Sequence, residues 1–321
     1  MSINTDMPVH VTDVTSVADN VKRFRLARLD GQPMPVFSGG AHVVVSMLDD
    51  GKLRRNPYSL MSAPHDASAY EISVLRVEQS RGGSAFMHER VRPGDRLTIS
   101  QPVNLFPIDQ RGRKHILVAG GIGITPFIAM MEQLSRESRT FELHYAVRTR
   151  THGAYWKQLH ERYGDHRVKT YCDAESLFIP VTRLLEHQPL GTHLYVCGPN
   201  GMIEGVLGSA RQAGWPEQNL HCERFLAPPP GNPFSVVLQR SGKQVRVGDH
   251  QSILEAVEAA GIDAPFLCRG GACGQCETAV VSLDGTLKHN DHYLSDAEKA
   301  AGRRVMICVS RFEGRELVLD L

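Results

Sequence analysis

Several features that would assign this chain to a broad class of protein are missing from its sequence. No apolar run approaches the ~20 residues that a membrane-spanning helix needs, and no basic tract indicates binding to nucleic acid. The 36 lysine and arginine residues almost balance the 35 aspartate and glutamate residues, so the net charge of +1 selects no partner. Residues 1–9 contain Asp6 and lack the apolar segment of a secretory signal, which predicts a cytoplasmic protein.

Two common catalytic motifs are also absent. The 15 histidines show no H-E-x-x-H or similar metal-ligand spacing, which argues against a zinc hydrolase of that type. Ser84 follows two glycines but does not lie in a G-x-S-x-G motif, which argues against a serine hydrolase. The sequence therefore nominates no general base.

Four of the seven cysteines have an informative spacing near the C-terminal end. Cys268, Cys273 and Cys276 follow the pattern C-x4-C-x2-C, and Cys308 follows at a distance, as in plant-type [2Fe-2S] sites. The glycines between the first three cysteines let backbone N–H groups approach the sulfur atoms. This spacing predicts a [2Fe-2S] cluster and the transfer of single electrons.

Zinc and disulfides are the alternatives for these cysteines. Structural zinc sites usually use two short cysteine pairs, whereas here three cysteines share one loop. Disulfides require an oxidising compartment, and the predicted cytoplasmic location is a reducing one. The other three cysteines, Cys172, Cys197 and Cys222, are scattered among apolar residues and are expected to be small buried side chains.

The length of 321 residues and the 41% hydrophobic content predict two or three domains. Residues 1–110 contain short apolar or alternating runs separated by Gly, Pro and Asp, which predicts an antiparallel β-barrel. Residues 111–227 alternate strands with helices, which predicts a parallel α/β domain. A proline-rich linker at 227–233 precedes a small α+β domain, residues 233–321, so the expected fold class is multidomain α/β and α+β.

Three local patterns make specific structural predictions. Residues 127–134 carry apolar side chains at i, i+3, i+4 and i+7, which predicts a helix that buries this face. Residues 234–247 predict a hairpin that turns at 241–242. Ser252 and Glu255 form a sequence-level capping box, which predicts a helix start.

Two turns of the α/β domain lie where a nucleotide could bind. The first turn contains Gly120, Gly121, Gly123, Thr125 and Pro126. It separates the first strand from the first helix, and a second turn, Cys197–Gly198–Pro199, follows a later strand. Ligands of open α/β sheets bind at such carboxyl ends. Because the spacing is not G-x-G-x-x-G, a tight strand-to-helix connection is the alternative.

Two segments of the first domain have unusual compositions. Residues 54–60 read Arg-Arg-Asn-Pro-Tyr-Ser-Leu, and residues 81–84 read Arg-Gly-Gly-Ser. The second segment places a guanidinium, backbone N–H groups and a hydroxyl before a predicted helix over 85–90, which favours phosphate binding. Either segment alone could equally be a surface turn.

In this order, the motifs resemble the phthalate dioxygenase reductase type of flavin and iron–sulfur oxidoreductase, which includes vanillate demethylase and carnitine monooxygenase reductases. The resemblance rests on Tyr58–Ser59, the RGGS, GGIGITP and CGP segments, the four cysteines and the final segment 317–321. The family order implies an FMN-binding barrel at 1–110, an NAD-binding domain at 111–227 and a plant-type ferredoxin domain with a β-grasp fold at 233–321.

The resemblance also implies roles for individual residues. The cofactor-binding positions would be Arg55, Asn56, Tyr58, Ser59, Ser73, Val74, Leu75, Arg81, Gly82, Gly83, Ser84, Gly120, Gly121, Gly123, Thr125, Pro126, Arg148, Asp173, Cys197, Gly198, Pro199 and Phe225. Of these, Thr125 and Phe225 would lie beside the reacting rings, although Phe225 could instead be a core residue that closes the last strand. The cluster ligands would be Cys268, Cys273, Cys276 and Cys308.

One position departs from the R-x-Y-S pattern of the family. Asn56 stands where the arginine is expected, so Arg55 lies either beside the flavin from a shifted position or in solvent. The RGGS segment resembles that of the FMN-binding branch and favours FMN over FAD. Asp173 favours NADH over NADPH, Arg148 and Arg150 favour the reverse, and all three could be solvated loop residues.

The implied function is that of an NADH-dependent reductase. Hydride would pass from NADH to FMN, and single electrons would pass through the [2Fe-2S] cluster to a Rieske-type terminal oxygenase. A redox-sensing or electron-carrier module and a reductase of free flavin or ferric chelates are the alternatives. The final substrate touches the oxygenase, so this sequence does not identify it.

Overall fold

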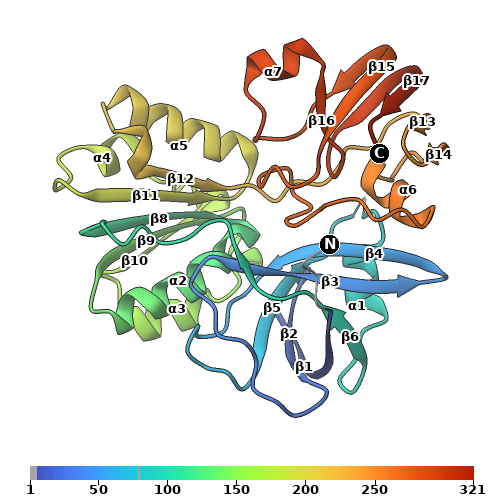
Figure 1. Ribbon diagram of the computed structural model, residues 1–321. Coiled ribbons are helices and arrows are strands. Elements are labelled where there is room, and N and C mark those ends of the chain that lie inside the picture. Colours follow the sequence, from blue (N-terminus) through green and yellow to red (C-terminus); the bar gives the residue numbers. More distant parts are fainter. Residues whose placement is uncertain (1–5, 79) are drawn as a thin grey trace. The chain divides into compact units, whose positions relative to one another are not determined.

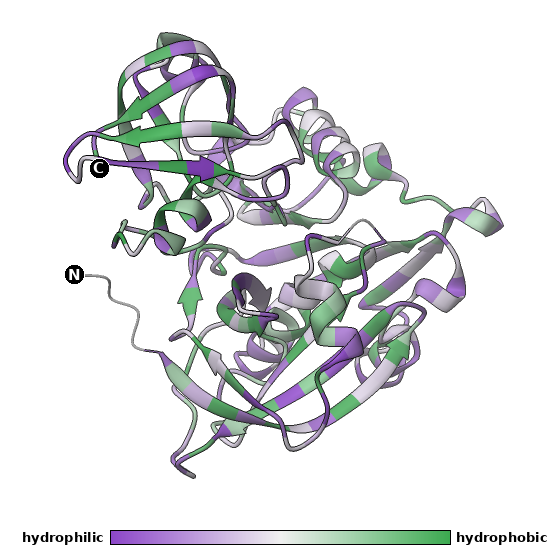
Figure 2. Cartoon of the chain, turned by 90° about the vertical axis from the view of Figure 1, so that its right-hand side faces the viewer, coloured by the Kyte–Doolittle hydropathy of each residue, from purple (hydrophilic) through white to green (hydrophobic). Residues whose placement is uncertain are grey.

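The computed structural model describes residues 6–78 and 80–321 (Figure 1). The chain divides into two compact units, one ending at Arg224 and the other beginning at Phe225, and each is described by itself. In both units the strands carry hydrophobic residues next to hydrophilic ones (Figure 2). Within the described ranges, no helix is both long and apolar enough to cross a membrane.

The first unit begins with a seven-stranded antiparallel sheet. Its elements are β1 (Met7–Ala18), β2 (Val21–Arg28), β3 (Ala41–Asp49), β4 (Lys52–Ser59), β5 (Tyr70–Leu75), α1 (Gly83–Glu89), β6 (Arg96–Ile99) and β7 (Val103–Asn104). The strand order is β4-β3-β6-β1-β2-β5, with β7 paired to β3. The end strands β4 and β5 contact each other, as expected for a barrel. Val43, Val45 and Met47 of β3 are fully buried in its core because alternate side chains of a strand share one face.

The same unit continues with a five-stranded parallel sheet. Its elements are β8 (Lys114–Gly120), η1 (Gly121–Ile124), α2 (Thr125–Arg136), β9 (Thr140–Val147), η2 (Arg150–His152), α3 (Trp156–Tyr163), β10 (Val168–Cys172), η3 (Asp173–Glu175), α4 (Val181–Leu185), β11 (Thr192–Cys197), α5 (Asn200–Gln212), η4 (Glu217–Asn219) and β12 (Leu220–Glu223). The strand order is β10-β9-β8-β11-β12, and every pair is parallel.

Helices cover both faces of this parallel sheet, because its central strands are apolar on both sides. Leu117 and Ala119 of β8 pack with α2 and α3, whereas Ile116 and Val118 pack with α4 and α5 (Figure 1). The chain runs from β8 outward to β10 and then returns to place β11 on the other side of β8. The carboxyl ends of β8 and β11 therefore flank the topological switch point of the sheet.

The second unit is a mixed sheet with two short helices. Its elements are β13 (Phe234–Leu238), β14 (Lys243–Val247), α6 (Ile253–Ala259), β15 (Glu277–Lys288), α7 (Asp296–Ala301), β16 (Arg304–Met306) and β17 (Arg311–Leu319). The order is β14-β13-β17-β15-β16, in which β13 and β17 are parallel and the other pairs antiparallel. Its core includes Val236, Ile253, Val257 and Leu317, all fully buried.

The proline-rich segment, residues 227–233, is hydrogen-bonded to side chains of the second unit. Arg311 is only 4% exposed, and its Nη2 donates to the carbonyl oxygens of Gly231 at 3.1 Å and Asn232 at 3.0 Å. Nη1 of the same guanidinium donates to the carbonyl oxygen of Gln251 at 2.7 Å. Asn290 Nδ2 also donates to the carbonyl oxygen of Ala227 at 3.1 Å. The segment 227–233 is therefore held on the surface of the sheet that follows it.

The fold class predicted from the sequence is confirmed. The helix predicted over 127–134 is part of α2, and its apolar positions are fully buried. The hairpin is formed by β13 and β14, and Ser252 with Glu255 makes a complete capping box at α6. The prediction that all three scattered cysteines are buried is wrong for Cys222, because the short strand β12 leaves this side chain exposed.

Candidate functional site

The four cysteines of the predicted cluster come together in the second unit. Cys268, Cys273 and Cys276 lie between α6 and β15, and Cys308 follows β16. A hydrogen bond from Cys273 lowers the pKa of Cys268, and a hydrogen bond from Cys308 lowers the pKa of Cys276. The backbone N–H of Gly270 donates to Cys268 Sγ at 3.3 Å. Convergent thiols with N–H groups directed at sulfur fit an iron–sulfur cluster.

Arg269 anchors the loop that carries the first three cysteines. It has a left-handed backbone with φ of 52° and is 7% exposed. Its guanidinium lies 3.9 Å from the centre of the Phe266 ring and forms an ion pair with Glu258 of α6. This buried contact fixes the loop against α6, since a buried cation is retained only where it is paired.

Two glycines let the remainder of the loop fold tightly. Gly271 and Gly274 have φ of 72° and 76°, which favours glycine. A Cβ at Gly274 would lie 2.3 Å from the Tyr293 ring, and one at Gly271 would lie 2.8 Å from Val309. The loop thus has no room for side chains at these two positions.

The two turns that were predicted to bind a nucleotide meet at the switch point of the parallel sheet. The first turn follows β8 and the second follows β11. A Cβ at Gly123 would lie 2.3 Å from the carbonyl oxygen of Cys197, and one at Gly120 would lie 2.7 Å from Pro199 Cδ. Close backbone contact is therefore possible only with glycine here. This is the edge where open α/β sheets bind ligands.

Thr125 and Pro126 open α2 directly after this turn. Thr125 is 2% exposed, and its Oγ1 donates to the carbonyl oxygen of Ile122 at 3.0 Å. The hydroxyl hydrogen thus closes the turn locally, while the oxygen keeps acceptor capacity. The contact of Thr125 with the reacting rings stays a prediction.

Strand β4 presents three polar side chains on one face. Arg54, Asn56 and Tyr58 alternate along this regular strand, opposite Met47, Val45 and Val43 of β3. Asn56 Nδ2 donates to Tyr58 Oη at 3.3 Å, and burial raises the pKa of Tyr58 to about 12. Arg55 lies on the opposite face of β4 because successive side chains alternate.

The Arg-Gly-Gly-Ser segment lies against this face of β4. A Cβ at Gly82 would lie 2.5 Å from Arg54 Cζ, and one at Gly83 would lie 2.2 Å from Asn56 Nδ2. Gly82 also has φ of 108°, which favours glycine. Arg54 therefore places its guanidinium beside this backbone, and Arg81, the residue before Gly82, is half-buried.

Ser84 is held by a neighbouring hydroxyl within this segment. Its Oγ donates to Ser80 Oγ at 2.9 Å, and the backbone N–H of Gly82 also donates to Ser80 Oγ at 3.0 Å. Ser84 Oγ also accepts a hydrogen bond from the backbone N–H of Val77 at 3.3 Å. The segment is thus a closed turn lined by hydroxyls, an amide and a guanidinium, which fits a phosphate group.

Buried Ser59 and half-buried Glu223 lie near each other between the two sheets of the first unit. Ser59 ends β4 and is 5% exposed, and Glu223 ends β12. Burial of its carboxyl raises the pKa of Glu223 to about 8, although the nearby Ser59 hydroxyl lowers it. Ser59 Oγ and Glu223 Oε2 are buried without a hydrogen-bond partner among the described residues. Such orphaned groups are usually completed by a bound molecule or water.

Some groups of β5 that were predicted to contact the flavin already have hydrogen-bond partners within the protein. Ser73 Oγ lies 2.6 Å from Tyr155 Oη, and His88 Nε2 lies 2.8 Å from the carbonyl oxygen of Val74. Because β5 is an end strand of its sheet, only alternate backbone groups of Ser73–Leu75 point away from its partner β2. Burial raises the pKa of Tyr155 to about 12, so this hydroxyl stays neutral.

Arg148 and Asp173 follow β9 and β10 and are both exposed. A pocket of about 370 Å³ lies over α3 and β10, and neither Arg148 nor Asp173 is among its lining residues. Its lining includes Arg150, Trp156 and Leu177. Arg150 Nη2 pairs with Glu175 Oε2 at 2.7 Å, and its Cζ lies 5.5 Å from the centre of the Trp156 ring.

Phe225 begins the second unit and is 50% exposed. Half exposure disagrees with the alternative of a core phenylalanine that closes the last strand. Its predicted role as the aromatic cover of the flavin stays a prediction.

Three residues were missed or undervalued in the sequence. Arg54 could have been found from its i, i+2, i+4 alternation with Asn56 and Tyr58. Glu223 could have been suspected as an acid at the carboxyl end of the last parallel strand. Nothing in the sequence indicates that Tyr155 contacts β5.

Comparisons with known proteins agree with this arrangement. Residues 98–220 match the family model described as dimethylamine monooxygenase subunit DmmA-like, N-terminal domain, and residues 236–313 match the 2Fe-2S iron-sulfur cluster binding domain. The carnitine monooxygenase reductase subunit of Acinetobacter baumannii is 44% identical over 98% of this chain and 98% of its own. The heme-dependent oxidative N-demethylase beta subunit of Ectopseudomonas mendocina is 42% identical over 99% of this chain and 100% of its own.

A solved structure shows the same architecture over nearly the whole chain. Phthalate dioxygenase reductase, a modular structure for electron transfer from pyridine nucleotides to [2Fe-2S], has a TM-score of 0.89 and 34% identity. The match covers 99% of this chain and 98% of that one. The chain therefore belongs to the phthalate dioxygenase reductase family of oxygenase reductases.

Proposed function

We propose that this protein is an NADH-dependent reductase that binds FMN and a [2Fe-2S] cluster and delivers single electrons to a terminal oxygenase protein. This proposal is carried by the convergence of Cys308 with Cys268, Cys273 and Cys276, whose loop directs a backbone N–H group at sulfur. When bound, flavin and cluster supply the conversion between a two-electron hydride donor and a one-electron acceptor.

The chain's own residues position these groups. Backbone N–H groups of the turn at 120–123 would hold the nucleotide diphosphate, because glycine lets the backbone approach it closely. The four cysteine thiolates would hold the iron atoms, and Arg269 would keep their loop in one conformation.

The site formed by Ser59 and half-buried Glu223 would contact the reacting rings. Its unpartnered Oγ and Oε2 atoms lie where β4 and the carboxyl edge of the parallel sheet approach each other. With a pKa of about 8, Glu223 is mostly protonated at neutral pH and can donate a hydrogen bond. It would thus offer a polar contact without placing a buried negative charge beside the flavin.

FMN is proposed over FAD because the turn at 81–84, with Arg54 beside it, fits a terminal phosphate. NADH is proposed over NADPH because Asp173 and Glu175 follow β10, on the adenosine side. Arg150, which would favour a 2′-phosphate, is already paired with Glu175.

Two kinds of oxygenase are candidate partners. A Rieske-type oxygenase is the partner implied by the family. The 42% identity to the beta subunit of a heme-dependent oxidative N-demethylase is almost equal to the 44% identity to a carnitine monooxygenase reductase, so a heme enzyme is the second candidate. The cytoplasmic location stays a prediction.

Reduction of the purified protein by NADH tests this proposal. We expect one FMN and one [2Fe-2S] cluster per chain, measured by absorbance and by the mass of the released flavin. Cytochrome c should be reduced over many turnovers with NADH. A colourless zinc protein would refute the proposal, and reduction that stops after one turnover would identify a redox sensor instead. Released FAD would refute only the FMN assignment.

A further inference from the structure

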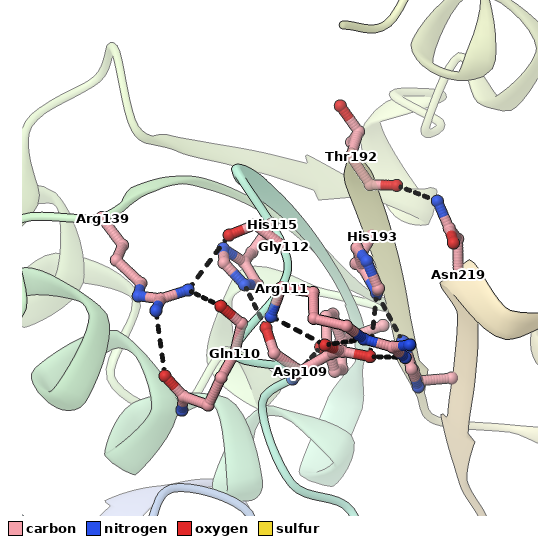
Figure 3. Close-up of polar contacts among 11 residues, drawn as sticks. Asp109, Gln110, Arg111, Gly112, His115, Arg139, Thr192, His193 and Asn219 are labelled. Atoms are coloured by element: carbon pink, nitrogen blue, oxygen red, sulfur yellow. Dashed lines mark hydrogen bonds and ion pairs between the residues drawn. The ribbon is translucent and has the colours of Figure 1, made fainter. Parts of the chain in front are cut away.

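Three metal-ligating side chains meet at the edge of the parallel sheet that lies away from the nucleotide turns. Asp109 lies in the connection between β7 and β8, and His193 is the second residue of β11 (Figure 3). His221 is the second residue of β12. One ligand atom of each side chain lies within 4.8 Å of the other two. Four residues of strand, about 13 Å, separate His193 from Cys197 at the opposite edge.

The distances between these atoms lie near those of a tetrahedral transition-metal site. His193 Nδ1 lies 2.9 Å from His221 Nε2 and 3.9 Å from Asp109 Oδ2. Zinc bonds of about 2.0–2.1 Å in tetrahedral geometry place ligand atoms about 3.3 Å apart. The His193–His221 contact is a hydrogen bond shorter than this value, and the His193–Asp109 separation is longer, so a metal would replace that hydrogen bond after side-chain shifts of about half an ångström. We propose that Asp109, His193 and His221 bind Zn²⁺, with a fourth position open to water.

The proposed ligands are already held in place by their neighbours. The His221 ring stacks on the Tyr195 ring with centres 4.4 Å apart and an interplanar angle of 15°. Tyr195 Oη also accepts a hydrogen bond from the backbone N–H of Asp109 at 2.7 Å. One tyrosine thus orients two of the three ligands, as supporting groups around metal sites do.

The loop around Asp109 is anchored independently of a metal. Arg139 Nη1 donates to the carbonyl oxygens of Gln110 and Gly112, both at 3.0 Å (Figure 3). His115 Nε2 lies 3.4 Å from the carbonyl oxygen of Asp109. A Cβ at Gly112 would lie 2.7 Å from His115 Nε2, so this position needs glycine. Binding would therefore require little ordering of the loop.

Arg111 competes with the proposed metal for Asp109. Its Nε donates to Asp109 Oδ1 at 3.0 Å and its Nη2 donates to Oδ2 at 2.6 Å. The Arg111 side chain is 75% exposed, so its guanidinium can move into solvent when a divalent cation takes its place on the carboxylate. Removing the guanidinium should thus strengthen metal binding rather than weaken it.

Calorimetric titration of the untagged holoprotein with Zn²⁺ tests the proposal. We expect saturable binding of one Zn²⁺ per chain in a buffer without chelators, and no binding of Mg²⁺, because imidazole ligands suit zinc and not magnesium. His193→Asn and His221→Asn should each weaken binding more than tenfold. Arg111→Gln should strengthen it severalfold. His166→Asn, at an exposed histidine outside the cluster, should bind as the wild type does.

Unchanged flavin and cluster absorbance in each variant shows that the fold is retained. Zn²⁺ should also raise the melting temperature of the wild type and of His166→Asn, but not that of His221→Asn. The proposal is overturned if the wild type shows no saturable binding. It is also overturned if folded His193→Asn and His221→Asn variants bind Zn²⁺ with wild-type affinity.

Discussion

Replacing Gly123 with alanine should disable the nucleotide site while leaving the iron–sulfur cluster intact. The new methyl group would lie 2.3 Å from the carbonyl oxygen and 2.5 Å from the carbonyl carbon of Cys197. Because ordinary contact begins near 3.4 Å, the two turns would have to separate by 3.4 − 2.3, or about 1 Å. Both neighbours are backbone atoms, so no side chain can rotate away.

The expected cost has a thermodynamic part and a kinetic part. Overpacking of this kind destabilises a protein by about 1–3 kcal/mol. A displacement of about 1 Å near reacting groups can reduce a rate about 100-fold. Stopped-flow measurement of flavin reduction against NADH concentration should therefore show a large loss of rate, of affinity or of both. The absorbance of the cluster should be unchanged.

Gly205→Ala is the matched control for this experiment. Gly205 lies inside α5 of the same sheet domain, and a Cβ there would meet nothing within 4 Å. Alanine should stabilise the helix by about 1 kcal/mol without changing flavin reduction. Wild-type affinity and rate in a folded Gly123→Ala variant would refute the assignment of this turn to the nucleotide.

Three further predictions address the other parts of the site. Arg54→Ala should weaken FMN binding by about tenfold or somewhat more, because one charge-assisted hydrogen bond is worth roughly 1.5–3 kcal/mol. Flavin titration of the apoprotein measures this affinity, with Arg55→Ala, on the opposite face of β4, as the control. A loss of affinity in Arg81→Ala alone would assign the phosphate contact to Arg81 instead. Cys308→Ser should abolish cytochrome c reduction but spare flavin reduction by NADH, since the cysteines lie in the second unit; loss of both in stopped-flow traces would contradict this. Folding raises the pKa of Glu223 from 4.5 to about 8. Between these pH values the folded state holds a proton that the unfolded state releases, so the free energy of unfolding should fall as pH rises from about 4.5 to 8. Thermal unfolding across this range should be less pH-dependent in Glu223→Gln, and an identical pH profile would show that Glu223 does not titrate in this window.

The local elements were predictable because their signals lie within a few neighbouring residues. The capping box of Ser252 and Glu255 depends on a spacing of three residues, and the buried face of α2 depends on one helical period. The cysteine spacing likewise lies mainly within one loop.

The contacts that combine distant segments were not predictable in the same way. Ser59 meets Glu223 only after two different sheets have formed and packed together. The choice of Arg54 over Arg55 depends on which residues of β4 face inward, and one residue of register reverses that choice. Asp109 and His193 likewise lie in a loop and a strand that carry no shared sequence motif.

The attachment of the proline-rich segment by Arg311 determines where the iron–sulfur part of the chain can be cut out as a separate fragment. Because the guanidinium is buried and satisfied by the carbonyl oxygens of Gly231 and Asn232, a fragment that starts at Pro233 would lose two acceptors and leave a cation partly unsatisfied. A fragment that starts at Phe225 keeps these acceptors and the contact between Ala227 and Asn290. In a fusion protein, the proline-rich segment should be kept as part of the folded domain and not treated as a flexible linker. A longer linker should therefore be inserted before Phe225.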